Sequence, residues 1–382
     1  MSYKNVKNQI KKNKQIRLKG GYTCIPFLLL PKLGQVVPGI EQEKYYLVTA
    51  NSKVGKTKLA DFLFVYNPYE FVTTKKSDIK LKIMYFSLEV SKEEKLSQYY
   101  SYKLYKDHNI VISPEKLKSR FENYILEDDI EKLIDSYDKE MENFESIVEI
   151  IDTIKNPFGI YKHVREYAYR NGDHYNHQGD LIPVDDLLSS DVTVRDKANL
   201  SIAGYRAHDP NEYVIVLVDH ISLLHTEKGQ DLWTAMFTFS SKYCLAMRDR
   251  WKYTPVVIQQ QTADQEKQQF TFKGDSIIAK LRPSPDGLAD CKLTQRDVNV
   301  MIGLFAPHRY KIENYEGYNI DKLGDNYREF NVMLNRNGSG FINIDLYFNG
   351  ASNFFKELPS SEIMGKDEKY YKAIDEINKR TK

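Results

Sequence analysis

The residues of this sequence best suited to chemistry form the loop Ala50-Asn51-Ser52-Lys53-Val54-Gly55-Lys56-Thr57. The spacing is that of a phosphate-binding loop, in which backbone N–H groups and the start of a helix together bind an anion. In such a loop Lys56 would reach the β- and γ-phosphates of ATP, and the Thr57 hydroxyl would bind Mg²⁺. Ala50 replaces the first glycine of the pattern, and alanine adopts a positive φ less readily.

Two acidic residues that follow apolar stretches could complete a magnesium-nucleotide site. Asp219 comes directly after Tyr213–Val218, and Glu89 lies two residues beyond Lys82–Ser87. Ligands of open α/β sheets bind at the carboxyl ends of the strands, so Asp219 is expected on the magnesium side. Glu89 would orient and polarise the attacking water. The alternative for Glu89 is that it only begins the next helix, with Ser87 as the cap.

The elements that must position these residues alternate between apolar strands and helices. The pattern predicts further strands at Tyr45–Thr49, Pro255–Ile258 and Val298–Phe305, helices at Lys58–Tyr66 (ending at Asn67-Pro68) and Asp231–Arg250, and a hairpin of Phe330–Leu334 with Ile342–Phe348. Strands separated by helices indicate a mostly parallel sheet covered on both faces. We therefore predict an α/β fold with a central parallel sheet and a C-terminal β-hairpin.

The segment Tyr85-Phe86-Ser87-Leu88-Glu89-Val90-Ser91 resembles the F-F-S-L-E-M-S motif of DnaB-type replicative helicases. Four other motifs of that family have counterparts in the same order: Val216-Leu217-Val218-Asp219, Pro255-Val256-Val257-Ile258 through Gln261, Leu288-Ala289-Asp290 through Val300, and Arg336-Asn337-Gly338. The resemblance spans about 21–358 and implies a RecA-like ATPase domain that acts as a ring, with a hexamer as the expected form.

Carried over residue by residue, the resemblance assigns the catalytic carboxylate to Glu89 and the magnesium-side acid to Asp219. Gln261 would sense the γ-phosphate and couple it to a DNA-contacting loop. Arg336 would be an arginine finger inserted into the nucleotide site of the adjacent subunit, a contribution of about 10³–10⁵ in rate in related phosphoryl transfer. The alternative for Arg336 is an exposed turn arginine.

The sequence departs from the family pattern at three places. Leu334 stands where the family has a basic residue two positions before the finger, and the acidic position of the E-Q-D stretch is shifted in Gln295-Arg296-Asp297. The family's N-terminal helical domain, a platform for primase and loader proteins, has no counterpart before Gly20. The resemblance nevertheless implies a primase or a loader protein as a partner, although the docking domain for it is not recognised.

Contacts to single-stranded DNA are expected between Gln261 and Leu288. The basic residues of this stretch are Lys267, Lys273, Lys280 and Arg282. In ring helicases such loops line the central channel and bind phosphates. A solvated loop without a ligand is the alternative, because the whole chain is rich in lysine.

Composition limits the classes of protein that remain. The chain has 382 residues, 41% of them hydrophobic, and a net charge of +2, which argues against a wholly basic nucleic-acid binder. Cys24, Cys244 and Cys291 lack paired spacing, so neither a disulfide framework nor a zinc site is expected. No apolar run is long enough to span a bilayer. We expect a cytoplasmic protein (host cytoplasm if viral) with no membrane partner.

We expect a basic arm or linker over 1–20, an ATPase domain over 21–360 with a helical insertion around 92–205, and a charged tail over 361–382. The resemblance and the composition suggest a phage or mobile-element replication helicase that uses ATP and Mg²⁺. Two alternatives stay open: a RecA-type recombination ATPase, and a nucleotide-gated ATPase that binds protein partners instead of DNA.

Overall fold

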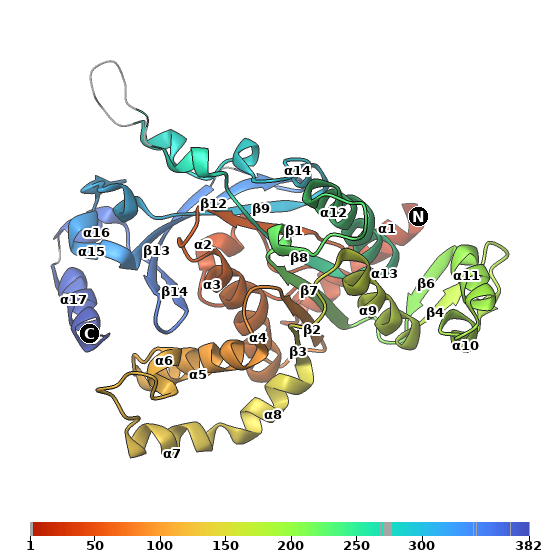
Figure 1. Cartoon of the computed structure of the whole chain (residues 1–382), viewed down its shortest axis with the longest axis horizontal. Coiled ribbons are helices and arrows are strands. Elements are labelled where there is room, and N and C mark those ends of the chain that lie inside the picture. Colours follow the sequence, from red (N-terminus) through yellow and green to blue (C-terminus); the bar gives the residue numbers. More distant parts are fainter. Residues whose placement is uncertain are drawn as a thin grey trace.

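The computed structural model describes residues 3–267, 269, 277–338, 340, 342–366 and 368–381. Within these ranges the main sheet has nine strands, in the order β14-β13-β12-β9-β1-β8-β7-β2-β3 (Figure 1). The strands from β9 to β3 are mutually parallel: β9 (Val300–Phe305), β1 (Tyr46–Ala50), β8 (Thr254–Gln260), β7 (Glu212–Asp219), β2 (Lys80–Ser87) and β3 (Val148–Ile151). The antiparallel strands β12 (Tyr327–Asn335), β13 (Ile342–Asn349) and β14 (Phe354–Glu357) complete it. The predicted parallel sheet and C-terminal hairpin are confirmed.

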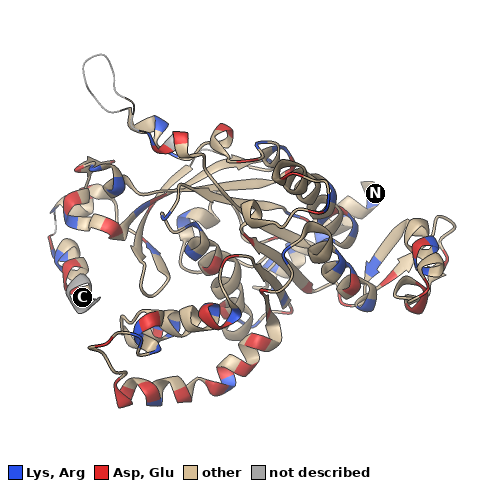
Figure 2. Ribbon diagram, in the orientation of Figure 1, with Lys and Arg blue, Asp and Glu red and all other residues tan. Residues whose placement is uncertain are grey.

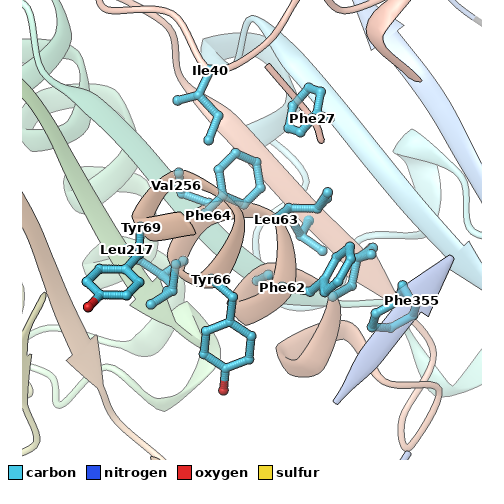
Figure 3. Close-up of a cluster of buried hydrophobic side chains, with 14 of the residues drawn as sticks. Phe27, Ile40, Phe62, Leu63, Phe64, Tyr66, Tyr69, Leu217, Val256 and Phe355 are labelled. Atoms are coloured by element: carbon cyan, nitrogen blue, oxygen red, sulfur yellow. The ribbon is translucent and has the colours of Figure 1, made fainter. Parts of the chain in front are cut away.

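Helices cover both faces of this sheet, which is why its strands are apolar on both sides. One face carries α3 (Lys56–Asp61), the π-helix η1 (Phe62–Tyr66), α4 (Asn67–Thr74) and α5 (Lys92–His108); the other carries α9 (Pro157–Arg170), α12 (Leu232–Thr238), the π-helix η3 (Phe239–Cys244) and α13 (Leu245–Trp251). Alternate residues of β1 enter the two cores, Val48 the first and Leu47 the second. Figure 3 shows the first core, where Phe62 of η1 packs against Phe355 of β14, a strand of the same sheet.

The helix that follows the phosphate loop does not end at Asn67-Pro68, as the sequence suggested. It continues through η1 into α4, with Pro68 in the first turn of α4. Pro68 has no N–H to donate, and the wider π-turn before it takes up the change in hydrogen-bond register. The buried Asn67 then ties this helix to the preceding chain, since its side chain bonds the backbone of Pro26 and Leu28.

The range 92–205 is not a purely helical insertion. Its first part is helical, with α5, α6 (Pro114–Leu117), α7 (Asp128–Ser136) and α8 (Asp138–Ile147), and acidic residues recur along α7 and α8 (Figure 2). The short strand β3 then joins the main sheet beside β2. The later part contains a small separate sheet of β4 (Gly172–Tyr175), β5 (Leu181–Ile182) and β6 (Gly204–Ala207), with α10 (Val184–Leu187) and α11 (Val192–Ser201) beside it. The strands were missed because each is only a few residues long.

The charged C-terminal segment is not a free tail. Its helices α16 (Ser361–Lys366) and α17 (Lys369–Thr381) bury Met364, Tyr371 and Ile374 in a third core. This core includes the short elements β10 (Asn314–Tyr315), β11 (Tyr318–Asn319) and α15 (Ile320–Leu323). At the other end α1 (Tyr3–Leu18) buries none of its residues. The remaining α-helices are α2 (Pro31–Gly34) and α14 (Thr294–Asp297). A bilayer-crossing helix, one both long and apolar enough, does not occur in the part of the chain described above.

Candidate active site

The phosphate loop connects β1 to α3 at the centre of the sheet. β1 lies between β8 and β9, so Ala50 faces Gln260 on one side and Leu304 on the other. The loop turns back through Lys53 (φ 58°) and Gly55 (φ 106°), and the helix starts at Lys56. Ala50 belongs to the strand and does not adopt a positive φ. The missing first glycine therefore causes no backbone strain.

Thr57 and Asp219 meet beside this loop. The Thr57 Oγ1 donates a hydrogen bond of 3.0 Å to Asp219 Oδ1, and Asp219 is fully buried at the carboxyl end of β7. A hydroxyl and a carboxylate are oxygen ligands of the kind that Mg²⁺ prefers. The residues present thus fit a magnesium ion held between the loop and the sheet.

The second oxygen of Asp219 enters a buried network that the sequence did not indicate. Asp219 Oδ2 lies 3.1 Å from the Tyr85 hydroxyl oxygen and 3.4 Å from Lys95 Nζ. Lys95 also pairs with Asp61 Oδ2 at 3.0 Å, and Tyr85 donates to Asp61 Oδ1 at 2.7 Å. Burial raises the pKa of Asp61, and the charge of Lys95 opposes that shift. The only sequence signal was Asp61 itself, an acid within an apolar helical stretch.

Glu89 lies at the same edge of the sheet on a loop anchored to Asp219. Ser87 pairs with Asp219 across β2 and β7, and the N–H of Leu88 donates to the Asp219 carbonyl oxygen at 2.8 Å. The Glu89 side chain is 53% exposed, with Oε2 3.9 Å from His220 Nε2. Burial, and then the charge of Lys56, lower the pKa of His220. Glu89 thus lies half-exposed at this edge of the sheet, with His220 as its neighbour.

Glu89 does not start the following helix with Ser87 as its cap. Helix α5 begins at Lys92, and its cap is Ser91, whose side chain accepts a hydrogen bond from the N–H of Glu94. The Ser87 hydroxyl instead bonds the Val90 carbonyl oxygen. The alternative reading of Ser87 is therefore wrong, and Glu89 lies in the loop before the helix.

Comparison with solved structures identifies the architecture. The ATPase domain of a helicase superposes with a TM-score of 0.65 over 94% of this chain and 99% of that one, at 16% identity. A DnaB-like replicative helicase, described with its interactions with primase, superposes with a TM-score of 0.63 over 92% of this chain and 67% of that one, also at 16% identity. The chain has the RecA-like fold of a helicase ATPase domain. The sequence itself matches no protein-family model and no curated protein.

In this RecA-like domain Gln261 is hydrogen-bonded to the end of β1, the strand that leads into the phosphate loop. Its N–H donates to the Ala50 carbonyl oxygen at 3.1 Å, and its side chain donates to Thr49 Oγ1 at 3.0 Å. The same side chain both donates to and accepts from the backbone of Ser284. Gln261 thus links the end of β1 to the chain segment that returns from the predicted DNA-contacting stretch.

A second acid contacts the loop from that stretch. Glu266 Oε1 accepts a hydrogen bond of 2.9 Å from the N–H of Ser52, while Arg309 donates to the Ser52 carbonyl oxygen. Asn51 donates to the Tyr310 hydroxyl at 2.6 Å. Nothing in the sequence singled out these residues, because each reaches the loop from a distant part of the chain.

Arg336 lies at the opposite edge of the sheet. Asn335, the residue before it, pairs with Val300 at the start of β9, whereas Ala50 pairs with Leu304 near the end of β9. That separation is about 13 Å at ~3.3 Å per residue. The guanidinium bonds backbone oxygens of its own chain, those of Val298 (2.7 Å) and Arg296 (2.5 Å). Arg336 is therefore remote from the phosphate loop of its own chain.

The residues predicted to contact DNA have different environments. Lys267 is exposed and pairs with Asp264 at 2.6 Å, and Lys280 donates to Gln269 Oε1 at 2.6 Å. Arg282 is held by Glu316 at 2.8 Å and by the buried Glu329 at 3.1 Å. This arrangement favours a structural role for Arg282. Lys273 lies outside the described residues.

Proposed function

We propose that this chain hydrolyses ATP at the phosphate loop. The observation that carries the proposal is the contact of Thr57 with the buried Asp219 at the head of α3. Lys56 and Glu89 lie at the same edge of the sheet. Thr57 and Asp219 would hold Mg²⁺, which when bound offsets the negative charge of the phosphates. Glu89 would accept a hydrogen bond from the attacking water and orient it.

We further propose that Arg336 completes the site of an adjacent copy. Its distance from its own loop supports this role, because a finger on the far edge of the sheet can only meet a nucleotide bound by another chain. Sites shared between neighbours are completed in a closed ring, of which a hexamer is the expected form.

The activity proposed for the assembly is translocation on single-stranded DNA with separation of the duplex. The similarity of the fold to helicase ATPase domains supports this proposal. Gln261 also connects the phosphate loop to the stretch of sequence that contains Lys267, Lys273 and Lys280. Two alternatives use the same fold. A RecA-type recombination ATPase would form joint molecules instead of unwinding, and a protein-binding ATPase would show no stimulation by DNA.

The first experiment measures ATP turnover with and without single-stranded DNA. Lys56→Ala, Glu89→Gln and Arg336→Ala are each expected to abolish turnover. The matched control for Glu89→Gln is Glu93→Gln, an exposed glutamate on the first turn of α5, which should be neutral. If Glu89→Gln and Glu93→Gln have equal rates, Glu89 is not the catalytic carboxylate.

The second experiment tests the shared site by complementation. Lys56→Ala subunits lack a working loop but keep Arg336, whereas Arg336→Ala subunits keep the loop. Neither is active alone, but an equal mixture should recover ~25% of the natural rate, since half the subunits have a loop and half of their neighbours carry the finger. No recovery after subunit exchange would mean that Arg336 does not act between copies.

A further inference from the structure

A buried arginine forms a hydrogen bond with the backbone of the phosphate loop. Arg328 lies on β12 with only 1% of its surface exposed. Its Nε donates a hydrogen bond of 2.7 Å to the carbonyl oxygen of Val54, inside the loop. The two residues are far apart in the sequence, and β12 brings them together because it runs antiparallel beside β9.

The rest of the guanidinium is fixed by its surroundings. Nη1 donates to the carbonyl oxygens of Asp325 (2.7 Å) and Tyr327 (2.8 Å), and Nη2 donates to Asp325 Oδ1 at 2.8 Å. One face of the group lies over the ring of Phe348, 4.5 Å from its centre. A planar fork held in this way loses little further freedom when Nε makes its bond to Val54.

Arg328 and Phe348 fill the side of the loop that faces the protein. A Cβ atom added to Gly55 would lie 3.3 Å from Phe348 Cζ, so the ring packs directly against the Gly55 backbone. Phosphates must therefore approach from the other side of the loop.

The bond to Val54 determines where the next N–H points. In a planar trans peptide the C=O and the N–H of one unit point in opposite directions. The Val54 carbonyl and the Gly55 N–H belong to one such unit, so holding the carbonyl toward Arg328 turns the N–H toward the phosphate side. If the unit flipped, a carbonyl oxygen would face the phosphates and repel them.

We propose that Arg328 is a positioning residue of the phosphate loop, which fixes the Val54–Gly55 peptide so that its N–H faces the phosphates of a bound nucleoside diphosphate or triphosphate. The inference rests on the proposed nucleotide site and adds a residue that does not touch the ligand itself. A lysine at this position would keep the charge but lose the fork that bonds Val54 and Asp325 at the same time.

The test measures equilibrium binding of ADP and AMP to the full chain, in magnesium, by competition with a fluorescent ADP analogue. Arg328→Met removes the donors and keeps the apolar stem, and Arg328→Lys keeps the charge. Arg170→Met is the matched control, because it makes the same substitution at an exposed arginine, at the end of α9 on the other face of the sheet. ADP affinity should fall about tenfold in Arg328→Met, which corresponds to one hydrogen bond to a charged group. It should fall less in Arg328→Lys and not in Arg170→Met.

The affinity for AMP distinguishes a loss of loop positioning from a general loss of structure at the site. AMP lacks the β-phosphate that the loop amides bind, so its affinity should change much less than that of ADP. Equal losses for ADP and AMP, or an unchanged ADP affinity in a folded Arg328→Met, would overturn the proposal. If Arg328→Met does not fold, Arg328→Lys decides: its ADP-to-AMP preference must be smaller than that of the natural chain. Failure of the natural chain to bind ADP better than Lys56→Ala would instead refute the nucleotide site, and this role with it.

Discussion

The buried Lys95 makes the sharpest prediction about stability. Its side chain is 3% exposed, and it lies between two acids that are themselves buried, 3.0 Å from Asp61 and 3.4 Å from Asp219. Lys95→Met would leave two carboxylates together in the interior without a cation. Removing one partner of a buried pair costs about 3–5 kcal/mol of folding free energy, because the remaining charge stays uncompensated.

Lys103 on the same helix provides the comparison. Its side chain is 12% exposed and pairs with Asp107 at 2.8 Å and Glu140 at 3.0 Å, but both acids are about a third exposed. A partly solvated pair of this kind contributes about 1 kcal/mol or less. Lys103→Met should therefore cost far less than Lys95→Met, although each removes a lysine with two acidic neighbours from α5.

The assay is urea unfolding followed by circular dichroism, for both single variants and for Lys95→Met combined with Asp61→Asn. The double variant removes the cation together with one acid, so it should regain a large part of the stability lost in Lys95→Met. The reasoning fails if Lys95→Met and Lys103→Met have the same free energy of unfolding, or if Asp61→Asn adds to the loss instead of reducing it.

Three further predictions each concern one residue. Glu266→Gln should bind ADP a few-fold more tightly by the same competition assay, because the acid now bonds the Ser52 N–H and competes with phosphate; weaker binding would contradict this. Gly55→Ala should lose ADP binding, since φ is 106° and the new methyl group would crowd Phe348; a folded variant with natural affinity would be inconsistent with it. Burial lowers the pKa of His174 to about 4, so the folded state disfavours its charged form. The contribution of neutral His174 to thermal stability should be fully present above about pH 6.5 and should be lost as the pH falls toward 4. The melting temperature of His174→Phe should therefore decline less over this pH range than that of the natural chain.

The sequence predicted the parts of the site that depend on neighbouring residues. The phosphate loop is a continuous stretch between a strand and a helix, and Asp219 follows the most apolar strand of the chain. Such residues are identifiable because the local pattern alone places them at one edge of a parallel sheet. The hairpin of β12 and β13 was also predicted from a local pattern, because its two strands and their connecting turn are adjacent in the sequence.

The residues that were missed reach the site through tertiary packing. Lys95 lies in a charged helix with no pattern that separates it from its neighbours, and Arg328 lies near the start of a strand late in the chain. Which face of α5 is buried depends on its docking against the sheet, and no single-sequence period reports that docking. The predicted end of the helix at Asn67-Pro68 was wrong for a related reason. The π-helix η1 precedes the proline, and the helix continues into α4.

The topology of the last strands explains how one chain can hold both halves of the proposed site without joining them. β9 runs parallel to β1, so its end lies beside the phosphate loop, and β12 runs back antiparallel to it. The start of β12 therefore places Arg328 under the loop, while its end carries Arg336 to the opposite edge. In the proposed assembly, Arg328 at the start of β12 therefore supports the nucleotide site of its own chain. Arg336, which follows the end of β12, contacts the nucleotide bound by the neighbouring chain.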